Sequence, residues 1–196
     1  MRRILGISLV VLTCAAPAMA GDFRLFGSYW NTSDADDTFG GGLGFGFPLG
    51  SSPFSLGVTG TYYKQLSDRP FHNLFEDNTS QGFFEKDSLQ VIPVDVTFRY
   101  HFPTDGNVQP WIGAGASYFF LDSSREGVDI DDETGWNASA GAEFGSRDGG
   151  ARFFAEAIYR NTKATVHRDR SSVDLVHDVN LNLDGLGANA GIVWRW

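Results

Sequence analysis

The stretch that decides the fold runs from Ser88 to Phe102 and reads SLQVIPVDVTFRYHF. From Ile92 to Phe102 every even-numbered residue is bulky and aliphatic or aromatic, whereas the odd-numbered residues from Asp95 to His101 are Asp, Thr, Arg and His. Because successive side chains of a β-strand point to opposite faces, this alternation predicts a strand with one apolar and one polar face. A tilted strand needs about 9–11 residues to cross a bilayer, and this stretch is long enough.

Seven other segments alternate in a similar way, which predicts eight strands in all. Small polar residues and glycine dominate the second face of most segments, with Phe26, Phe154 and Ile158 as apolar exceptions. The chain contains 24 glycines and 14% aromatic residues, a composition typical of tight, curved sheets. The seven segments are Asp22–Asn31, Thr38–Phe47, Phe54–Gln65, Val108–Leu121, Gly135–Gly145, Ala151–Thr162 and Leu183–Trp196.

The connections between these segments alternate in length. The short ones are rich in turn-forming Pro, Gly, Ser and Asp, and they are Pro48–Pro53, Pro103–Asn107 and Ser146–Gly150. The longer ones are Thr32–Asp37, Leu66–Asp87, Asp122–Thr134 and Lys163–Asn182. Outer-membrane barrels have short periplasmic turns and longer extracellular loops. Residues 21–196 are therefore predicted to form an all-β, eight-stranded antiparallel up-and-down transmembrane β-barrel, with extracellular loops at 32–37, 66–87, 122–134 and 163–182.

The first twenty residues have the pattern of a cleaved secretory signal peptide. Arg2 and Arg3 give a positive start, Ile4–Val11 is a short apolar core, and Ala18-Met19-Ala20 is a small-x-small cleavage site. Thr13 precedes Cys14, where a lipoprotein signal usually has Gly or Ala, so the cysteine is expected to leave with the signal. The formal net charge of −9 argues against nucleic acid as a partner. These features predict export to the bacterial outer membrane.

The direction of the two faces separates two kinds of barrel. A soluble, lipocalin-like barrel places its apolar residues inside, whereas a membrane barrel turns them toward lipid. Aromatic residues near strand ends suit the girdles of a membrane barrel, and these are Trp30, Tyr62, Tyr100, Phe102, Tyr118, Tyr159, Trp194 and Trp196. The sequence favours the membrane barrel, with a soluble sheet protein as the alternative.

Short motifs resemble those of known barrel families. The run Pro110–Tyr118 resembles the Pro-Tyr-Val-Gly-Ala-Gly strand of the OmpA-like and OmpW-like outer-membrane barrels, a group that includes opacity-type domains, and Val94–Phe102 resembles their aromatic-rich fourth strand. The end, Gly191–Trp196, resembles the terminal strand that the barrel-assembly machinery reads, with Trp196 in place of the usual Phe. The resemblance implies a barrel fold and an assembly signal at Trp194 and Trp196. It implies no particular function, because fold alone does not fix one.

Charged residues lie on the face expected to line the lumen. The set consists of Arg24, Asp95, Arg99, Glu143, Glu156, Arg160 and Arg195. Charges buried in a narrow lumen need partners, so an ionic network that plugs the barrel is the first interpretation. A narrow or gated ion path is the second. The interior of an eight-stranded barrel is only about wide enough for side chains, which argues against open diffusion.

Two of the longer loops are strongly charged. The loop 122–134 is acidic, but its spacing lacks the glycine and distal glutamate of a calcium loop, so we predict no metal site. The loop 163–182 contains Lys163, His167, Arg168 and Arg170. Basic residues of this kind bind phosphate groups, such as those of surface lipopolysaccharide. Solvated loop charge is the favoured interpretation of both segments, with metal binding as the alternative for the first and phosphate binding as the alternative for the second.

No catalytic residue and no cofactor are predicted. Some barrels of this size deacylate lipid A with a His-x-Ser pair, but the spacing from His167 to Ser171 is wrong for that motif, and His101 has no serine near it in sequence. The leading hypothesis is therefore a non-enzymatic anchor in the outer membrane. Its surface loops would serve envelope integrity or bind lipid, lipopolysaccharide or a surface ligand. The alternatives are a narrow ion or small-solute channel and a lipid A-modifying enzyme.

Overall fold

The computed structural model describes residues 21–33, 37–66, 89–123, 128–130, 132–146, 150–168 and 179–196. The predicted signal peptide at 1–20 and nearly all of the predicted loop 66–87 lie outside these residues. Within the described part of the chain, no helix is long and apolar enough to cross a membrane.

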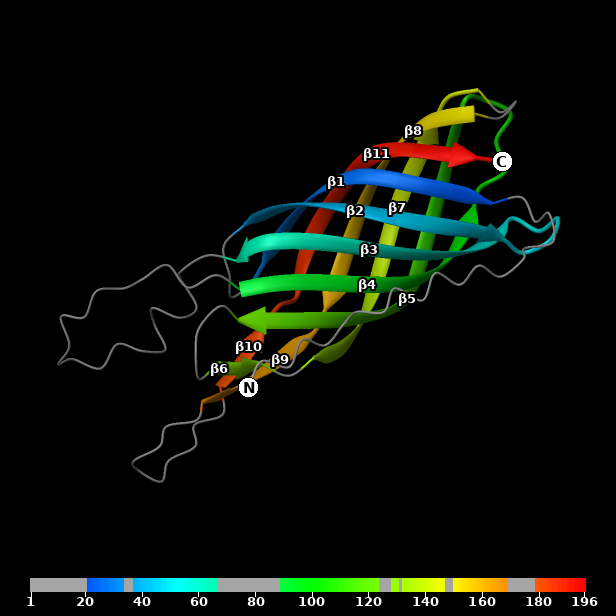
Figure 1. Cartoon of the computed structure of the whole chain (residues 1–196). Coiled ribbons are helices and arrows are strands. Elements are labelled where there is room, and N and C mark those ends of the chain that lie inside the picture. The colour runs from blue at the N-terminus through cyan, green and yellow to red at the C-terminus, as the bar shows by residue number, and fades with distance from the viewer. Residues whose placement is uncertain are drawn as a thin grey trace.

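Eight strands form a closed antiparallel barrel (Figure 1). Around the barrel the order is β1-β11-β8-β7-β5-β4-β3-β2, so neighbours in sequence are neighbours in space and β1 closes the cylinder against β11. That closing ladder runs from Asp22 opposite Arg195 to Thr32 opposite Gly185. The predicted fold class is confirmed. The eight strands are β1 (Asp22–Thr32), β2 (Thr38–Pro48), β3 (Phe54–Leu66), β4 (Leu89–His101), β5 (Val108–Ser123), β7 (Glu133–Phe144), β8 (Gly150–Asn161) and β11 (Gly185–Arg195).

The apolar face of the barrel points outward. On β4, Phe98 is 47% exposed whereas its neighbours Thr97 and Arg99 are 2% and 1% exposed. The same contrast recurs on the other strands, where large apolar side chains such as Leu43 and Trp136 are half exposed. A water-soluble barrel would bury these side chains, whereas lipid can cover them without a loss of hydrogen bonds. The structure therefore supports the membrane barrel over the soluble alternative.

The two ends of the barrel differ. β2 joins β3, β4 joins β5 and β7 joins β8 through short turns at one end, where β1 begins and β11 ends (Figure 1). Two glycines at this end, Gly50 in a turn with φ of 66° and Gly150 at the start of β8 with φ of 90°, adopt backbone conformations that L side chains rarely adopt. By the rule for outer-membrane barrels, this short-turn end faces the periplasm and the opposite end faces outward.

A second, three-stranded sheet lies beyond the outward end (Figure 1). It consists of β6 (Val128–Ile130), β9 (Lys163–Arg168) and β10 (Val179–Asn182). Two of the segments predicted as loops therefore contain strands. The reason is that the hairpin of β8 and β11 continues past the barrel, with Asn182 opposite Lys163, and β6 then pairs with the free edge of β9.

Candidate functional site

The periplasmic half of the lumen contains an ionic cluster centred on Glu143 of β7. The side chain of Glu143 has no exposed surface, and three arginines surround it. Arg24 donates to Oε1 at 3.1 Å, and Arg195 donates to Oε2 at 2.6 Å. Arg152 completes the set with a 3.4 Å ion pair to Oε2. One buried carboxylate thus holds guanidinium groups from β1, β8 and β11 together.

Two further side chains belong to this cluster. Asp22 accepts a 2.9 Å hydrogen bond from Nε of Arg24. A Cβ at Gly46 would overlap the Asp22 carboxylate, so the glycine of β2 makes room for it. The amide oxygen of Gln109 accepts hydrogen bonds from Arg152 at 3.2 Å and from Arg195 at 3.1 Å. Every member of the cluster therefore meets a group of opposite or complementary polarity.

A second network, in the outward half of the lumen, is centred on Asp95 of β4. Arg160 of β8 pairs with it, with Nη2 2.7 Å from Oδ2 and Nε within 3.3 Å of both carboxylate oxygens. Ser117 donates to Oδ1 at 2.6 Å. The hydroxyl of Tyr63 accepts a 3.3 Å hydrogen bond from Arg160. This is a bidentate, desolvated pair whose remaining lone pairs are satisfied by neighbours, the arrangement that a buried ion pair requires.

Two of the predicted lumen residues stand apart from both networks. Arg99 is 1% exposed, and no carboxylate among the described residues pairs with it. Its guanidinium lies over the indole of Trp111, with 4.8 Å from Cζ to the ring centroid. Glu156 is also buried, and its hydrogen-bond partner is the amide of Asn189 at 3.4 Å. The structure thus places all seven predicted residues on strands lining the lumen, but joins only five of them in ion pairs.

Aromatic side chains fill the lumen between the charges. The assignment of Trp30 to an interfacial girdle is wrong: its side chain has no exposed surface and packs against Tyr63 and Phe119 inside the barrel. The physical reason is parity, because Trp30 is an even-numbered residue of β1 and shares the inward face of Arg24. Phe26, one of the apolar exceptions noted in the sequence, is buried in the same way.

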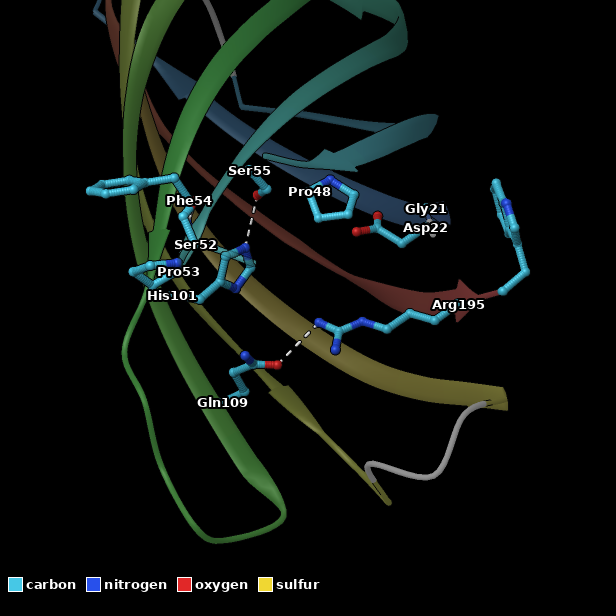
Figure 2. A pocket seen from close by; sticks show the side chains of 11 residues that line it. Gly21, Asp22, Pro48, Ser52, Pro53, Phe54, Ser55, His101, Gln109 and Arg195 are labelled. Atoms are coloured by element: carbon cyan, nitrogen blue, oxygen red, sulfur yellow. Dashed lines mark hydrogen bonds between the residues drawn. The ribbon is translucent and has the colours of Figure 1, made fainter. Parts of the chain in front are cut away.

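A cavity of about 300 Å³ opens at the periplasmic mouth of the barrel (Figure 2). His101 lies on its wall, with Nε2 2.8 Å from Oγ of Ser55. No serine lies near His101 in sequence, but the register of β3 and β4 brings Ser55 to it from a distant part of the chain. Nδ1 of His101, however, has no hydrogen-bond partner among the described residues. A nucleophilic triad needs a third group that orients the imidazole through this nitrogen, and the pair lacks one.

Asp22 and Arg152 are the charged members of the periplasmic cluster that the sequence interpretation missed. The sequence could have identified both. Asp22 lies two residues from Arg24 on β1 and Arg152 lies four residues from Glu156 on β8, so the alternation of the strand puts each on the same inward face as a predicted lumen residue. Among the residues that the structure describes, no three histidine, cysteine, aspartate or glutamate side chains come together in a way that could hold a metal ion.

Comparison with known families decides the classification. The family described as "Outer membrane protein beta-barrel domain" matches residues 6–195. The chain belongs to this family. Membership in the outer membrane protein β-barrel domain family places the protein in the bacterial outer membrane, which agrees with the outward apolar face. No curated protein sequence matches the chain significantly.

Solved barrels resemble this member of the family in fold. Neisserial surface protein A aligns with 91% of this chain and 97% of its own at 15% identity and a TM-score of 0.60. The outer membrane protein AlkL aligns over 91% and 90% at 12% identity and a TM-score of 0.57. A major outer membrane protein from Thermus thermophilus aligns over 90% and 99% at 11% identity and a TM-score of 0.55. At such low identity, these likenesses bear on the fold alone.

Proposed function

We propose that the protein is a non-enzymatic anchor whose barrel holds a binding surface outside the outer membrane. The observation that carries this proposal is the second sheet beyond the outward end of the barrel (Figure 1). The three strands come from two different connections: β6 lies between β5 and β7, whereas β9 and β10 lie between β8 and β11. Because β6 pairs with β9, each connection restrains the other. Binding groups held on paired strands keep their geometry better than groups on loops.

The sequence of this sheet suggests the chemistry of the contact. Lys163, His167 and Arg168 belong to β9, and basic groups of this kind bind phosphate. The register places Asp129 of β6 opposite His167, so the acidic and basic segments of the sequence meet in one sheet. The proposed partner is the phosphate-bearing headgroup of lipopolysaccharide in the outer leaflet around the barrel.

The filled lumen supports an anchor over a channel. Trp30 and Phe119 pack in the outward half, 6.2 Å apart between ring centroids, beside the Asp95–Arg160 pair. In the periplasmic half, Phe26 packs edge-on against the ring of Phe154 at 6.0 Å. An interior of this width is filled by side chains and leaves little room for solute diffusion.

The experiment is to replace residues 163–182 with an Asn-Gly turn. The backbone N–H of Leu183 already donates to the carbonyl of Thr162 at 3.2 Å, so the hairpin can close there without strain. We expect the variant to keep the heat-dependent gel mobility of a folded barrel and to lose binding to vesicles containing lipopolysaccharide. Asp105→Asn, on an exposed turn at the other end, is the control and should change neither property.

Three results would contradict the proposal. A shortened chain that no longer folds would show that the outer sheet is part of the barrel's stability and that the barrel is not an independent anchor. Stepwise conductance of the wild-type protein in planar bilayers would favour the channel. Lipid A from cells with and without the protein should give identical mass spectra, and a mass difference would favour the lipid A-modifying enzyme.

A further inference from the structure

The inward-facing charges of the described barrel do not balance. Asp95 and Arg160 neutralise each other in the outward half. The remaining buried or partly buried set contains four guanidinium groups and three carboxylates, which leaves one positive charge. Its members are Arg24, Arg99, Arg152 and Arg195 against Asp22, Glu143 and Glu156. An uncompensated charge is expensive to hold away from water, so a counter-charge is expected close to it.

Of these four arginines, all of them in the described part of the chain, only Arg99 has no ion pair. The side chain is buried to 1% exposure, and neither Nε nor Nη1 has an acceptor among the described residues. A Cβ at Gly57 would overlap its guanidinium, so a glycine of β3 admits the side chain to this position. The chain thus makes space for a buried cation, and no carboxylate of the described residues lies within ion-pair distance of it.

Other unused donors gather around the same indole. Trp111 is 1% exposed, and its Nε1–H has no acceptor in the part of the chain described. The Arg24 guanidinium also lies over this ring, at 5.7 Å from its centroid, and its Nη1 is likewise without a partner. Three buried side chains therefore offer N–H groups, two of them cationic, around Trp111.

One residue that lines the periplasmic cavity is a direct cross-strand neighbour of Trp111. His101 lines the cavity (Figure 2) and lies directly opposite Trp111 in the register of β4 and β5. Arg195 lines it as well, and its guanidinium is only partly buried. A small ion that enters the cavity from the periplasm therefore meets the guanidinium of Arg195, beside the carboxylate of Asp22 that lines the same cavity.

We propose that the lumen around Trp111 binds one small monovalent inorganic anion of halide size, held by N–H groups of Arg99, Arg24 and Trp111. Such an anion neutralises the excess charge and gives the buried donors the acceptor that the protein does not provide. The proposal is independent of the outer sheet and of the function proposed for it. It predicts a binding site inside the barrel without requiring that ions cross it.

Bromide tests this site, because a heavy halide next to an indole quenches its fluorescence. The folded full-length chain in detergent is titrated with sodium bromide at constant ionic strength, kept with sodium gluconate. Collisions with bromide in solution quench exposed tryptophans in proportion to its concentration. We expect an additional quenching component that saturates as the site fills, and we expect chloride to reduce this component by competing with bromide for the site. Trp111→Phe should remove the saturable component, which assigns it to this indole among the five tryptophans.

Two charge variants separate the site from a general effect of lumen charge. Arg99→Gln should raise the half-saturating bromide concentration at least tenfold. The double variant Asp95→Asn with Arg160→Gln removes a buried pair elsewhere in the lumen and should leave the titration unchanged. Heat-dependent gel mobility establishes that each variant is folded, and Arg99→Met replaces Arg99→Gln where the latter fails to fold. Strictly linear quenching of the wild type, or saturable quenching that survives the loss of Arg99, would overturn the proposal.

Discussion

Replacing Glu143 with glutamine keeps the shape of the side chain and removes the charge that three arginines share. Arg24 and Arg152 are 1% and 2% exposed, so neither can recover its lost interaction from water. Arg195 is 33% exposed and regains part of its hydration. Because removal of one partner leaves a buried charge uncompensated, we expect the free energy of unfolding to fall by about 3–5 kcal/mol.

The assay is urea unfolding of the barrel in lipid vesicles, followed by tryptophan fluorescence and checked for reversibility. Glu133→Gln is the matched control, because it makes the same chemical change on the same strand at a residue with no ion pair among the described residues. That control should shift the unfolding free energy by less than about 0.5 kcal/mol. If Glu143→Gln behaved like Glu133→Gln, the periplasmic cluster would not stabilise the barrel and the reasoning from burial would be refuted.

Three further changes test other parts of the structure. Asp95→Asn and Arg160→Gln should each lower the free energy of unfolding by about 3 kcal/mol. In a double-mutant cycle the double variant should lose clearly less than the sum of the two, and additive losses would mean that the pair is not coupled. Gly115→Ala places a methyl group against a backbone carbonyl oxygen of the adjacent strand and should lower the free energy of unfolding by about 1–3 kcal/mol. Gly27→Ala is the control: a Cβ at Gly27 would have no neighbouring atom within 4 Å, so the unfolding midpoint should not change. Trp196→Ala should slow assembly in cells without changing refolding into detergent, and equal rates in cells would remove the assembly-signal prediction.

Alternation along single segments was sufficient to predict the barrel. The parity of Ile92–Phe102 gives both the strand and its outward face, and the lengths of the connections give the order of the hairpins. The same parity would also have placed Asp22, Arg152 and Trp30 in the lumen. Trp30 lies near a strand end, which is typical of a girdle residue, but its parity on β1 turns its side chain into the lumen.

Contacts between strands could not be predicted, because they depend on register and on the shear of the closed barrel. Ser55 and His101 lie 46 residues apart and meet only because β3 pairs with β4. The grouping of Arg24, Arg152 and Arg195 around one carboxylate has the same origin. The outer sheet was missed for a related reason: β6 is only three residues long, and its partner comes from another connection.

The central claim is that lipid covers one face of every strand while the charged and aromatic residues of the other face fill the lumen. Carbene labelling tests this directly on the wild-type protein in lipid vesicles, with a lipid-soluble diazirine and mass spectrometry of the labelled peptides. We expect label on Phe98 and Trp136, which are 47% and 50% exposed on the outside, and none on Trp30 or Phe119, which are fully buried. Label on Trp30 and Phe119 together with protection of Phe98 and Trp136 would mean that the faces are reversed, and would contradict the account.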